Sequence, residues 1–428
     1  MFPRIDSPLE KKTMFYPVRP SMVRWSPGDG GRGHRRALVK SCAACLAVLW
    51  QASAFSQSAF QPYASAYYEH DSNLFDSAAG VQLPAGITGS DTTLEYVAGL
   101  HGDAKWSLDD FTYDIEGRRF NYDRNSYLDH NSYLLSGRLA WVLANVVDGS
   151  LGVRQEQLLQ PFDQRLTTTL ALQTDRAADV LVRIGLQPSW HLELGVKYHQ
   201  IDAPQIDLPD YGLHETTSTA ALKFRVVEKL ELGLDAQYLA GDIYGAPGTL
   251  PYRQGTGQFT ANYVATGIST FTASAGYTDR TAVGAEAGNY SGPIGALGYT
   301  RKLTGKTSVN LQLTRTVNSY VYQGNAEIDT SAIAAVDWKA THKIDVGLNV
   351  TETHSVYIGQ PIVPGYPAGL TAQYLKTNLE VRYKPERWLL FRLYGQYQRR
   401  NSNEPLFAFS GNTVGLEFRL GFSPDVIL

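Results

Sequence analysis

The chain has 428 residues, with 38 Lys and Arg against 41 Asp and Glu, and it is rich in Tyr (26) and Gly (39). The first 54 residues hold nine of the basic and three of the acidic residues, so the remainder has a net charge of about −9, which disfavours nucleic acid and anionic polymers as general partners. No apolar run after residue 60 approaches the roughly 18 residues that a membrane-spanning helix needs.

The N-terminal segment has the features of a secretory signal. A basic region at 34–40 is followed by an apolar stretch, Cys42 to Trp50, and by the small-x-small cleavage site Ala52-Ser53-Ala54. Both cysteines and all three methionines lie in this segment, so the rest of the chain can form no disulfide. We expect an N-terminal extension plus cleaved signal peptide over residues 1–54 and a single domain over 55–428; the start codon remains open among Met1, Met14 and Met22.

From about Tyr63 to the end, apolar and polar residues alternate with a period of two. In the last such segment, Val414 to Phe422, apolar side chains alternate with Gly, Glu and Arg, and the pattern recurs at 230–238, 344–350 and 389–393. A period of two predicts strands with one apolar and one polar face. A long series of such strands behind a secretory signal predicts an all-β protein, a transmembrane antiparallel β-barrel of the bacterial outer membrane.

Two kinds of connection alternate along this region. Short turns are predicted at 105–109, 145–149, 187–190, 227–229, 266–267, 303–306, 340–342 and 384–387, and longer polar loops at 71–91, 123–130, 160–173, 202–213, 242–252, 279–289, 318–329, 355–370 and 399–410. Eight turns and nine loops separate 18 strands of roughly 9–11 residues, with 16 strands as the runner-up. Residues 166–174 are assigned to an external loop or a strand extension.

The alternation of turns and loops also predicts an orientation. In such barrels the short turns face the periplasm and the long loops the exterior, so both termini are expected in the periplasm. Five tryptophans lie in or near predicted short turns: Trp106, Trp141, Trp190, Trp338 and Trp388. They predict an aromatic girdle at the periplasmic interface, and chance placement at strand ends is the alternative.

If the apolar set faces lipid, the alternating polar set faces the barrel lumen. The candidate pore-lining residues carry both signs of charge: Glu116, Arg118, Arg138, Arg154, Arg183, Lys197, Lys223, Arg225, Asp235, Lys376, Glu380, Arg382, Arg392, Glu417 and Arg419. Such charges commonly pair across strands and stiffen the wall; alternatively they line a water-filled pore and tune its selectivity. Eighteen strands leave room for an aqueous channel.

Aromatic residues gather in or near the predicted external loops: Tyr68, Phe120, Tyr122, Tyr127, Tyr211, Tyr252, Tyr320, Tyr322, Tyr357 and Tyr366. Aromatic rings suit stacking against sugars, and they also suit an outer interfacial girdle. We favour the girdle for most of them.

No catalytic or cofactor site is predicted, because the chain has no Gly-x-Ser-x-Gly elbow, phosphate-binding loop or zincin helix. One loop combines potential metal ligands, since His199 and His214 flank Asp202, Asp207 and Asp210. These residues suit a divalent cation, but a solvated acidic loop is the favoured interpretation. We therefore expect neither a metal nor an enzymatic activity.

Three segments early in the alternating region share a pattern. They are Ala66 to Phe75, with the turn Asp71, Ser72, Asn73, Leu74 and Phe75; Ser90-Asp91 before a strand ending Ala98-Gly99-Leu100; and Phe120-Asn121-Tyr122 before Tyr127-Leu128-Asp129. Together they resemble the beta-barrel porin 2 family, which includes outer-membrane proteins encoded with exopolysaccharide biosynthesis operons. The specific resemblance covers residues 63–130, with His70 in place of an acidic residue and with Ser423 to Leu428 following the last strand.

The resemblance implies an outer-membrane barrel linked to exopolysaccharide export and implies no catalytic residue. Its turn is alternatively structural only, because Asp and Asn favour turns. A general or sugar-uptake porin and a non-conducting barrel, either an adhesin or an enzyme, are the competing functions. The expected partners are outer-membrane lipid, the barrel-insertion machinery and, for export, exopolysaccharide and the periplasmic export machinery.

The signal sequence generates the first prediction. We expect protein isolated from outer membranes to begin near Phe55 or Gln57, because the signal peptidase cleaves after a small residue. N-terminal sequencing measures this directly. Recovery of a mature chain that still contains Cys42 would contradict it.

Overall fold

The computed structural model describes residues 60–143, 146–165, 167–187, 189–203, 211–245, 248–283, 288–319, 326–359 and 367–421. The predicted N-terminal segment 1–54 and the segment Ser423 to Leu428 lie outside these ranges.

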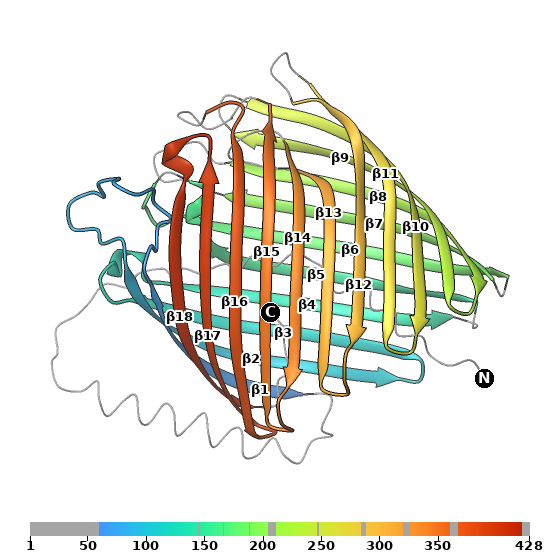
Figure 1. The fold of residues 1–428 in the computed structure, drawn as a ribbon, viewed down its shortest axis with the longest axis horizontal. Coiled ribbons are helices and arrows are strands. Elements are labelled where there is room, and N and C mark those ends of the chain that lie inside the picture. Colours follow the sequence, from blue (N-terminus) through green and yellow to red (C-terminus); the bar gives the residue numbers. More distant parts are fainter. Residues whose placement is uncertain are drawn as a thin grey trace.

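Eighteen antiparallel strands form one closed barrel in which each strand pairs with its sequence neighbours (Figure 1). The strands are β1 Gln61–Asp71, β2 Asp91–Trp106, β3 Asp109–Tyr122, β4 His130–Leu143, β5 Val147–Leu159, β6 Leu172–Gln187, β7 Trp190–Ala203, β8 Tyr211–Val227, β9 Leu230–Gly245, β10 Gly248–Thr266, β11 Ser269–Ala282, β12 Tyr290–Lys302, β13 Thr307–Ser319, β14 Ala326–Lys339, β15 Ile344–Ile358, β16 Thr371–Glu386, β17 Leu389–Ser402 and β18 Phe409–Gly421. The predicted fold class and the count of 18 are confirmed.

The barrel closes where the first strand pairs with the last. β1 and β18 run antiparallel from Tyr63 opposite Gly421 to Asp71 opposite Thr413. Gly421 has φ +120°, and a Cβ at this position would meet the carbonyl oxygen of Pro62, so a residue without a side chain is required there. Because the strand number is even, the start of β1 and the end of β18 lie at the same end of the barrel.

Except between β9 and β10, the connections alternate in length as predicted (Figure 1). All eight predicted short turns join strands at the end of the barrel where β1 begins, and the other connections lie at the opposite, loop end. Three of the longer connections contain one 3-10 turn each: η3 Ser126–Leu128, η4 Phe162–Gln164 and η5 Pro405–Phe407. Within the described ranges, no helix is long and apolar enough to cross a membrane.

Two expectations about the strands are wrong. The predicted loop at 242–252 is mostly strand, since Gly245 pairs with Gly248 and only two residues separate β9 from β10. Except for β1, which has 11 residues, the strands are also longer than the predicted 9–11 residues, and the longest, β10, has 19. Apolar side chains such as Ile243 continue to be buried near the loop end, so pairing remains favourable there.

The segment 166–174 does not add a strand. Its residues from Leu172 onward begin β6, which agrees with the predicted strand extension. Leu166 lies outside the described residues.

The two faces of the wall differ as the alternation predicts. In β18, the side chains of Val414 and Leu416 are 55% and 54% exposed on the outside, whereas Thr413 and Glu417 are 5% and 3% exposed and point inward. Four of the five tryptophans noted above lie on strands and share the outward parity, and all five lie at the short-turn end. Their location is therefore as predicted, while their contact with a membrane interface stays a prediction.

The outward face generates a second prediction. Leu416→Arg places a charge in the middle of β18 on the apolar exterior, which costs about 2–4 kcal/mol at the midplane of a bilayer. We expect a lower yield of heat-modifiable, folded barrel in outer-membrane fractions on semi-native gels. Leu416→Val is the control, because it keeps the position apolar. Equal yields for both variants would place this face away from lipid.

Candidate functional site

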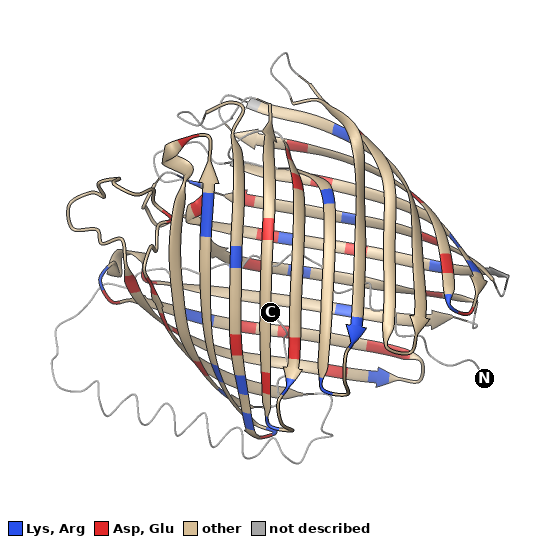
Figure 2. Cartoon of the chain, viewed as in Figure 1, with Lys and Arg blue, Asp and Glu red and all other residues tan. Residues whose placement is uncertain are grey.

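The candidate site is the inner face of the barrel, together with the loops that cover one mouth. Strand pairing places all fifteen predicted pore-lining residues on the face that turns away from the exposed apolar side chains. Figure 2 shows charges of both signs along most strands. Conduction through this lumen stays a prediction.

One charged network spans the strands around the closure of the barrel. The Arg392 guanidinium lies 2.7 Å from the Glu380 carboxylate and 3.6 Å from that of Glu417. Arg419 lies 2.8 Å from the same Glu417, to which the Tyr67 hydroxyl on β1 donates a hydrogen bond of 2.9 Å. The Glu417 side chain is therefore shared by β1, β17 and its own strand.

A second hydrogen bond crosses the closure from β17 to β1. The Tyr394 hydroxyl donates to the Glu69 carboxylate at 2.8 Å. On β3, Arg118 and Glu116 form an ion pair at 2.5 Å, and the Tyr63 hydroxyl of β1 donates to Glu116. Side chains thus reinforce the strand ladder on both sides of the seam, where the chain closes on itself.

Most other predicted lumen charges also have partners. The ion pairs are Arg138 with Asp179 (3.6 Å), Arg154 with Glu156 (2.8 Å), Arg183 with Asp148 (2.8 Å) and Glu193 (3.4 Å), Arg382 with Glu380 (3.4 Å), and Lys223 with Asp235 (2.5 Å). Among the described residues, Lys197 and Arg225 have no such partner. Pairing within and between strands therefore accounts for most of the set; the ion pairs between strands, such as Arg183 with Asp148 and Arg392 with Glu380, are those that the wall-stiffening interpretation expects.

The turn that carries the resemblance ties the first connection to the last strand. The backbone N–H of Asn73 donates to Asp71 Oδ1 at 2.7 Å, which forms an Asx turn, and Thr413 Oγ1 donates to Asp71 Oδ2 at 2.9 Å. Asn412 N–H donates to Ser72 Oγ at 2.7 Å, and the Asn73 amide donates to the Ser410 carbonyl at 3.0 Å. The polar half of the turn therefore closes the loop end of the β1–β18 seam.

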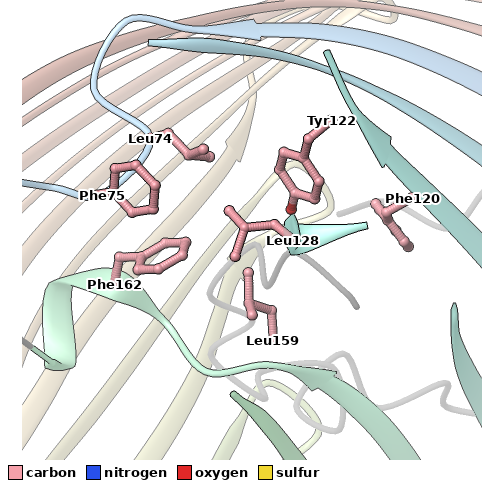
Figure 3. Packing of buried hydrophobic residues seen from close by; sticks show 7 residues of the cluster. All are labelled: Leu74, Phe75, Phe120, Tyr122, Leu128, Leu159 and Phe162. Carbon is pink, nitrogen blue, oxygen red and sulfur yellow. The ribbon is translucent and has the colours of Figure 1, made fainter. Parts of the chain in front are cut away.

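The apolar half of the turn enters a buried cluster, which we call the loop cluster. It joins the connections 72–90, 123–129 and 160–171 and consists of Leu74, Phe75, Phe120, Tyr122, Leu128, Leu159 and Phe162 (Figure 3). The Phe75 and Phe162 rings meet edge to face with centroids 4.8 Å apart. Phe120 and Tyr122 are inward residues of β3, so the three connections fold over the inside of the mouth.

A buried polar clamp fixes two of these connections. The backbone N–H of Arg124 and the backbone N–H of Asn125 each donate a hydrogen bond to the Asp91 carboxylate, at 3.0 and 2.8 Å. The Asn125 side chain in turn accepts a hydrogen bond from Thr88 N–H at 3.2 Å. Asp91 and Asn125 are each 1% exposed, so these bonds satisfy groups that would otherwise be buried without partners.

The loop cluster is anchored on strands far around the barrel. Arg400 of β17 donates to the carbonyl oxygen of Asp163 at 2.7 Å, and Tyr374 of β16 donates to Asp163 Oδ2 at 3.2 Å. The Gln398 amide on β17 donates to Asp76 Oδ1 at 2.6 Å. Burial raises the pKa of the Asp163 carboxyl, and the positive charge of Arg400 opposes that rise. The connection after β5 therefore crosses the mouth to β16 and β17.

A second group of contacts narrows the same mouth between β8 and β13. The Tyr252 hydroxyl donates to Glu215 at 2.6 Å, and the Ser319 hydroxyl donates to the same carboxylate. Arg280 donates to Ser319 Oγ at 3.1 Å, and its guanidinium lies 3.9 Å from the centre of the Tyr252 ring. Glu215 and Ser319 belong to strands that are not neighbours, so their contact draws this side of the mouth together.

The prediction for the loop aromatics is wrong in part. Phe120, Tyr122, Tyr252 and Tyr357 point inward and are at most 8% exposed, so they form no outer girdle. Tyr68, in contrast, is 55% exposed on the outside, and Tyr127 of η3 is 41% exposed. The sequence could have predicted this inward orientation from strand parity. Phe120 and Tyr122 follow the inward residues Glu116 and Arg118 at intervals of two, so all four lie on the same face of β3. Tyr320, Tyr322, Tyr366 and the side chain of Tyr211 lie outside the described residues.

The potential metal ligands that the structure describes, His199, Asp202 and His214, are engaged in other contacts. His199 lies 3.2 Å from Asp175 and 3.7 Å from Glu215, and Asp202 accepts a hydrogen bond of 2.5 Å from Tyr244. His214 packs against the ring of Tyr244. No group of three His, Cys, Asp or Glu side chains able to hold a metal ion occurs in the part of the chain that the structure describes, which omits Asp207 and Asp210.

Comparisons with known proteins give similarity of fold only. No protein-family model matches the chain, and neither does any curated protein. Among solved structures, the chain is similar to the outer membrane protein OpdK of Pseudomonas aeruginosa, with 14% identity and a TM-score of 0.46 over 86% of this chain and 100% of that one. The chain is also similar to the P. aeruginosa protein OccK2 (OpdF), solved in complex with glucuronate. The identity is 13% and the TM-score 0.45, over 85% of this chain and 98% of that one.

The siderophore receptor PirA of Acinetobacter baumannii is similar at 8% identity and a TM-score of 0.47, over 85% of this chain and 81% of that one. At these identities and scores, no residue role or ligand of those proteins transfers to this chain.

The loop cluster generates a third prediction. Phe162→Ala removes a ring that is 6% exposed, and Phe→Ala in a packed core costs about 3–5 kcal/mol. We expect the connection 160–171 to open, raising single-channel conductance, while the barrel strands remain folded by circular dichroism. Phe259→Ala is the matched control, because that ring is 71% exposed on the outside. Unchanged conductance in Phe162→Ala would show that the cluster does not restrict the lumen.

Proposed function

We propose that this protein is a porin-like β-barrel of the bacterial outer membrane. A closed antiparallel barrel leaves no unpaired strand edge, which is the condition for a sheet to span a lipid bilayer. The exposed apolar exterior and the tryptophans at the short-turn end support this location. By the same reasoning the short turns face the periplasm.

The observation that carries a pore function is the polar, charged inner wall of an 18-stranded barrel. Barrels of about eight strands fill their interior with side chains, whereas larger ones enclose channels or plugged lumens. Charged groups buried in a dry interior are costly, so a wall of this composition favours a lumen that contains water. The folded-in connections then act as the restriction of that channel.

We propose further that the transported solute is an exported polysaccharide and that the chain belongs with the beta-barrel porin 2 family. Leu74, Phe75, Phe120, Tyr122 and Leu128, which carry the resemblance, all lie in the loop cluster. The residues that carry the resemblance therefore belong to one structural feature, the loop cluster that covers the mouth of the barrel. This clustering supports the resemblance as a shared architecture of the mouth.

The fourth prediction separates the competing functions. Reconstituted protein should conduct ions in planar bilayers, and a deletion strain should lose surface or secreted polysaccharide while general solute uptake continues. The absence of any ion current in these bilayers would favour an adhesin or an enzyme. A conducting barrel whose deletion leaves polysaccharide unchanged would favour an uptake porin.

The orientation generates the fifth prediction. Ala79→Cys in the exposed part of connection 72–90 should react with an impermeant maleimide on intact cells, because the long connections are expected outside. Gly305→Cys in the turn between β12 and β13 should react only after the outer membrane is permeabilised. The mature chain is expected to have no other cysteine, so each label reports one position. The reverse pattern would defeat the proposed orientation.

A further inference from the structure

The inner wall is divided into a charged part and an uncharged part. Across β10 to β15, the middle of the inward face consists mainly of hydroxyl, amide and small side chains, with Ile294 and Ile333 as apolar exceptions. One row of paired residues across these six strands is Thr260, Ser274, Ala296, Thr314, Ser331 and Thr353. We call this surface, between the rims defined below, the neutral sector.

Charged inward residues of these strands lie only toward the two ends. At the loop end they are Arg280, Glu327 and Asp329, and at the short-turn end they are Lys302, Asp337, Lys339 and Asp345. Between these rims, none of the described inward positions of β10 to β15 carries a charge. Figure 2 shows few charged positions along β10 to β13 and many along β2 to β9.

The rest of the wall differs in chemistry and in how its groups are engaged. From β16 through β18 and on to β9, most inward charges form the ion pairs and tyrosine hydrogen bonds described above, with Lys197 and Arg225 as exceptions. Where the two surfaces meet, Lys223 of β8 binds Asp235 at 2.5 Å and the Thr260 hydroxyl at 3.1 Å. The hydroxyls of the neutral sector contact one another, as in Thr256 with Thr278 at 2.7 Å and Ser331 with Thr353 at 2.9 Å.

We infer that the neutral sector is the contact surface for an uncharged glycan and that the channel selects neutral over anionic chains. This inference rests on the proposed function of the barrel as a polysaccharide channel. Hydroxyl and amide groups both donate and accept hydrogen bonds, which matches the hydroxyls of a sugar. Many weak, equivalent sites allow a chain to bind and still move, as conduction requires.

Charge explains the discrimination against anionic chains. Between its rims the neutral sector offers no Lys or Arg to pair with a carboxylate or sulfate. At the short-turn rim Asp337 and Asp345 balance Lys302 and Lys339 in number, so this rim gives a polyanion no net attraction. The basic groups of the opposite wall are mostly held by acidic partners on the same wall, so binding an anion there would require breaking existing pairs.

The test uses the full mature protein in planar bilayers, with maltoheptaose as the neutral probe and heptagalacturonate as the anionic probe. We expect maltoheptaose to block the current reversibly and heptagalacturonate to block it at least tenfold more weakly. In the double variant Thr272→Val and Thr353→Val, two inward hydroxyls are lost without a change of shape. We expect a block by maltoheptaose that is about two- to tenfold weaker for each lost hydrogen bond.

Thr112→Val is the matched control, because Thr112 faces inward on β3 in the charged part of the wall, opposite Arg138. Its block by maltoheptaose should equal that of the unmodified protein. Gln312→Lys places a cation in the neutral sector and should create block by heptagalacturonate. Open channels that both probes block equally, or Thr→Val variants with unchanged block, would overturn this inference alone. Bilayers without any current would overturn the proposed function, and this inference with it.

Discussion

Closure of the sheet on itself is the constraint on which the rest of the structure depends. Every strand has two neighbours only because β1 pairs with β18, and a single open edge would leave backbone groups without partners in lipid. Side-chain contacts add to the backbone hydrogen bonds between β1 and β18. Tyr67 and Tyr394 add side-chain hydrogen bonds across it, Arg419 and Arg392 share Glu417 beside it, and the turn from Asp71 to Asn73 holds its loop end.

The same turn connects closure to the covering of the mouth. Its polar residues bind β18, and the next two residues, Leu74 and Phe75, enter the loop cluster. The seam and the cover are therefore one structural unit. Burial of each large apolar side chain contributes about 1.5–3 kcal/mol, so the cluster gives the folded-in connections a core of their own. Its anchor on Arg400 sets how far the cover reaches across the barrel.

Inside the barrel, ion pairing distinguishes one part of the wall from the other by its chemistry. Charges that pair across neighbouring strands stiffen the wall and present little free charge to a passing solute. The neutral sector of β10 to β15 presents hydroxyl and amide groups, which suit an uncharged solute. Such a channel combines a wall stiffened by ion pairs with an uncharged surface that offers hydrogen bonds. This combination is consistent with the proposal that the transported solute is a neutral polymer.

The sequence determined the strand pattern, because a period of two follows directly from the geometry of a pleated chain facing two solvents. The number of strands, the eight short turns and the inward face of residues such as Glu116 and Arg419 follow from that parity. The partners of those residues, the length of β9 and β10 and the burial of Phe120 and Tyr252 were decided by tertiary structure. Contacts such as Arg400 with Asp163 join residues far apart in the chain, and local periodicity contains no information about which loop crosses the mouth.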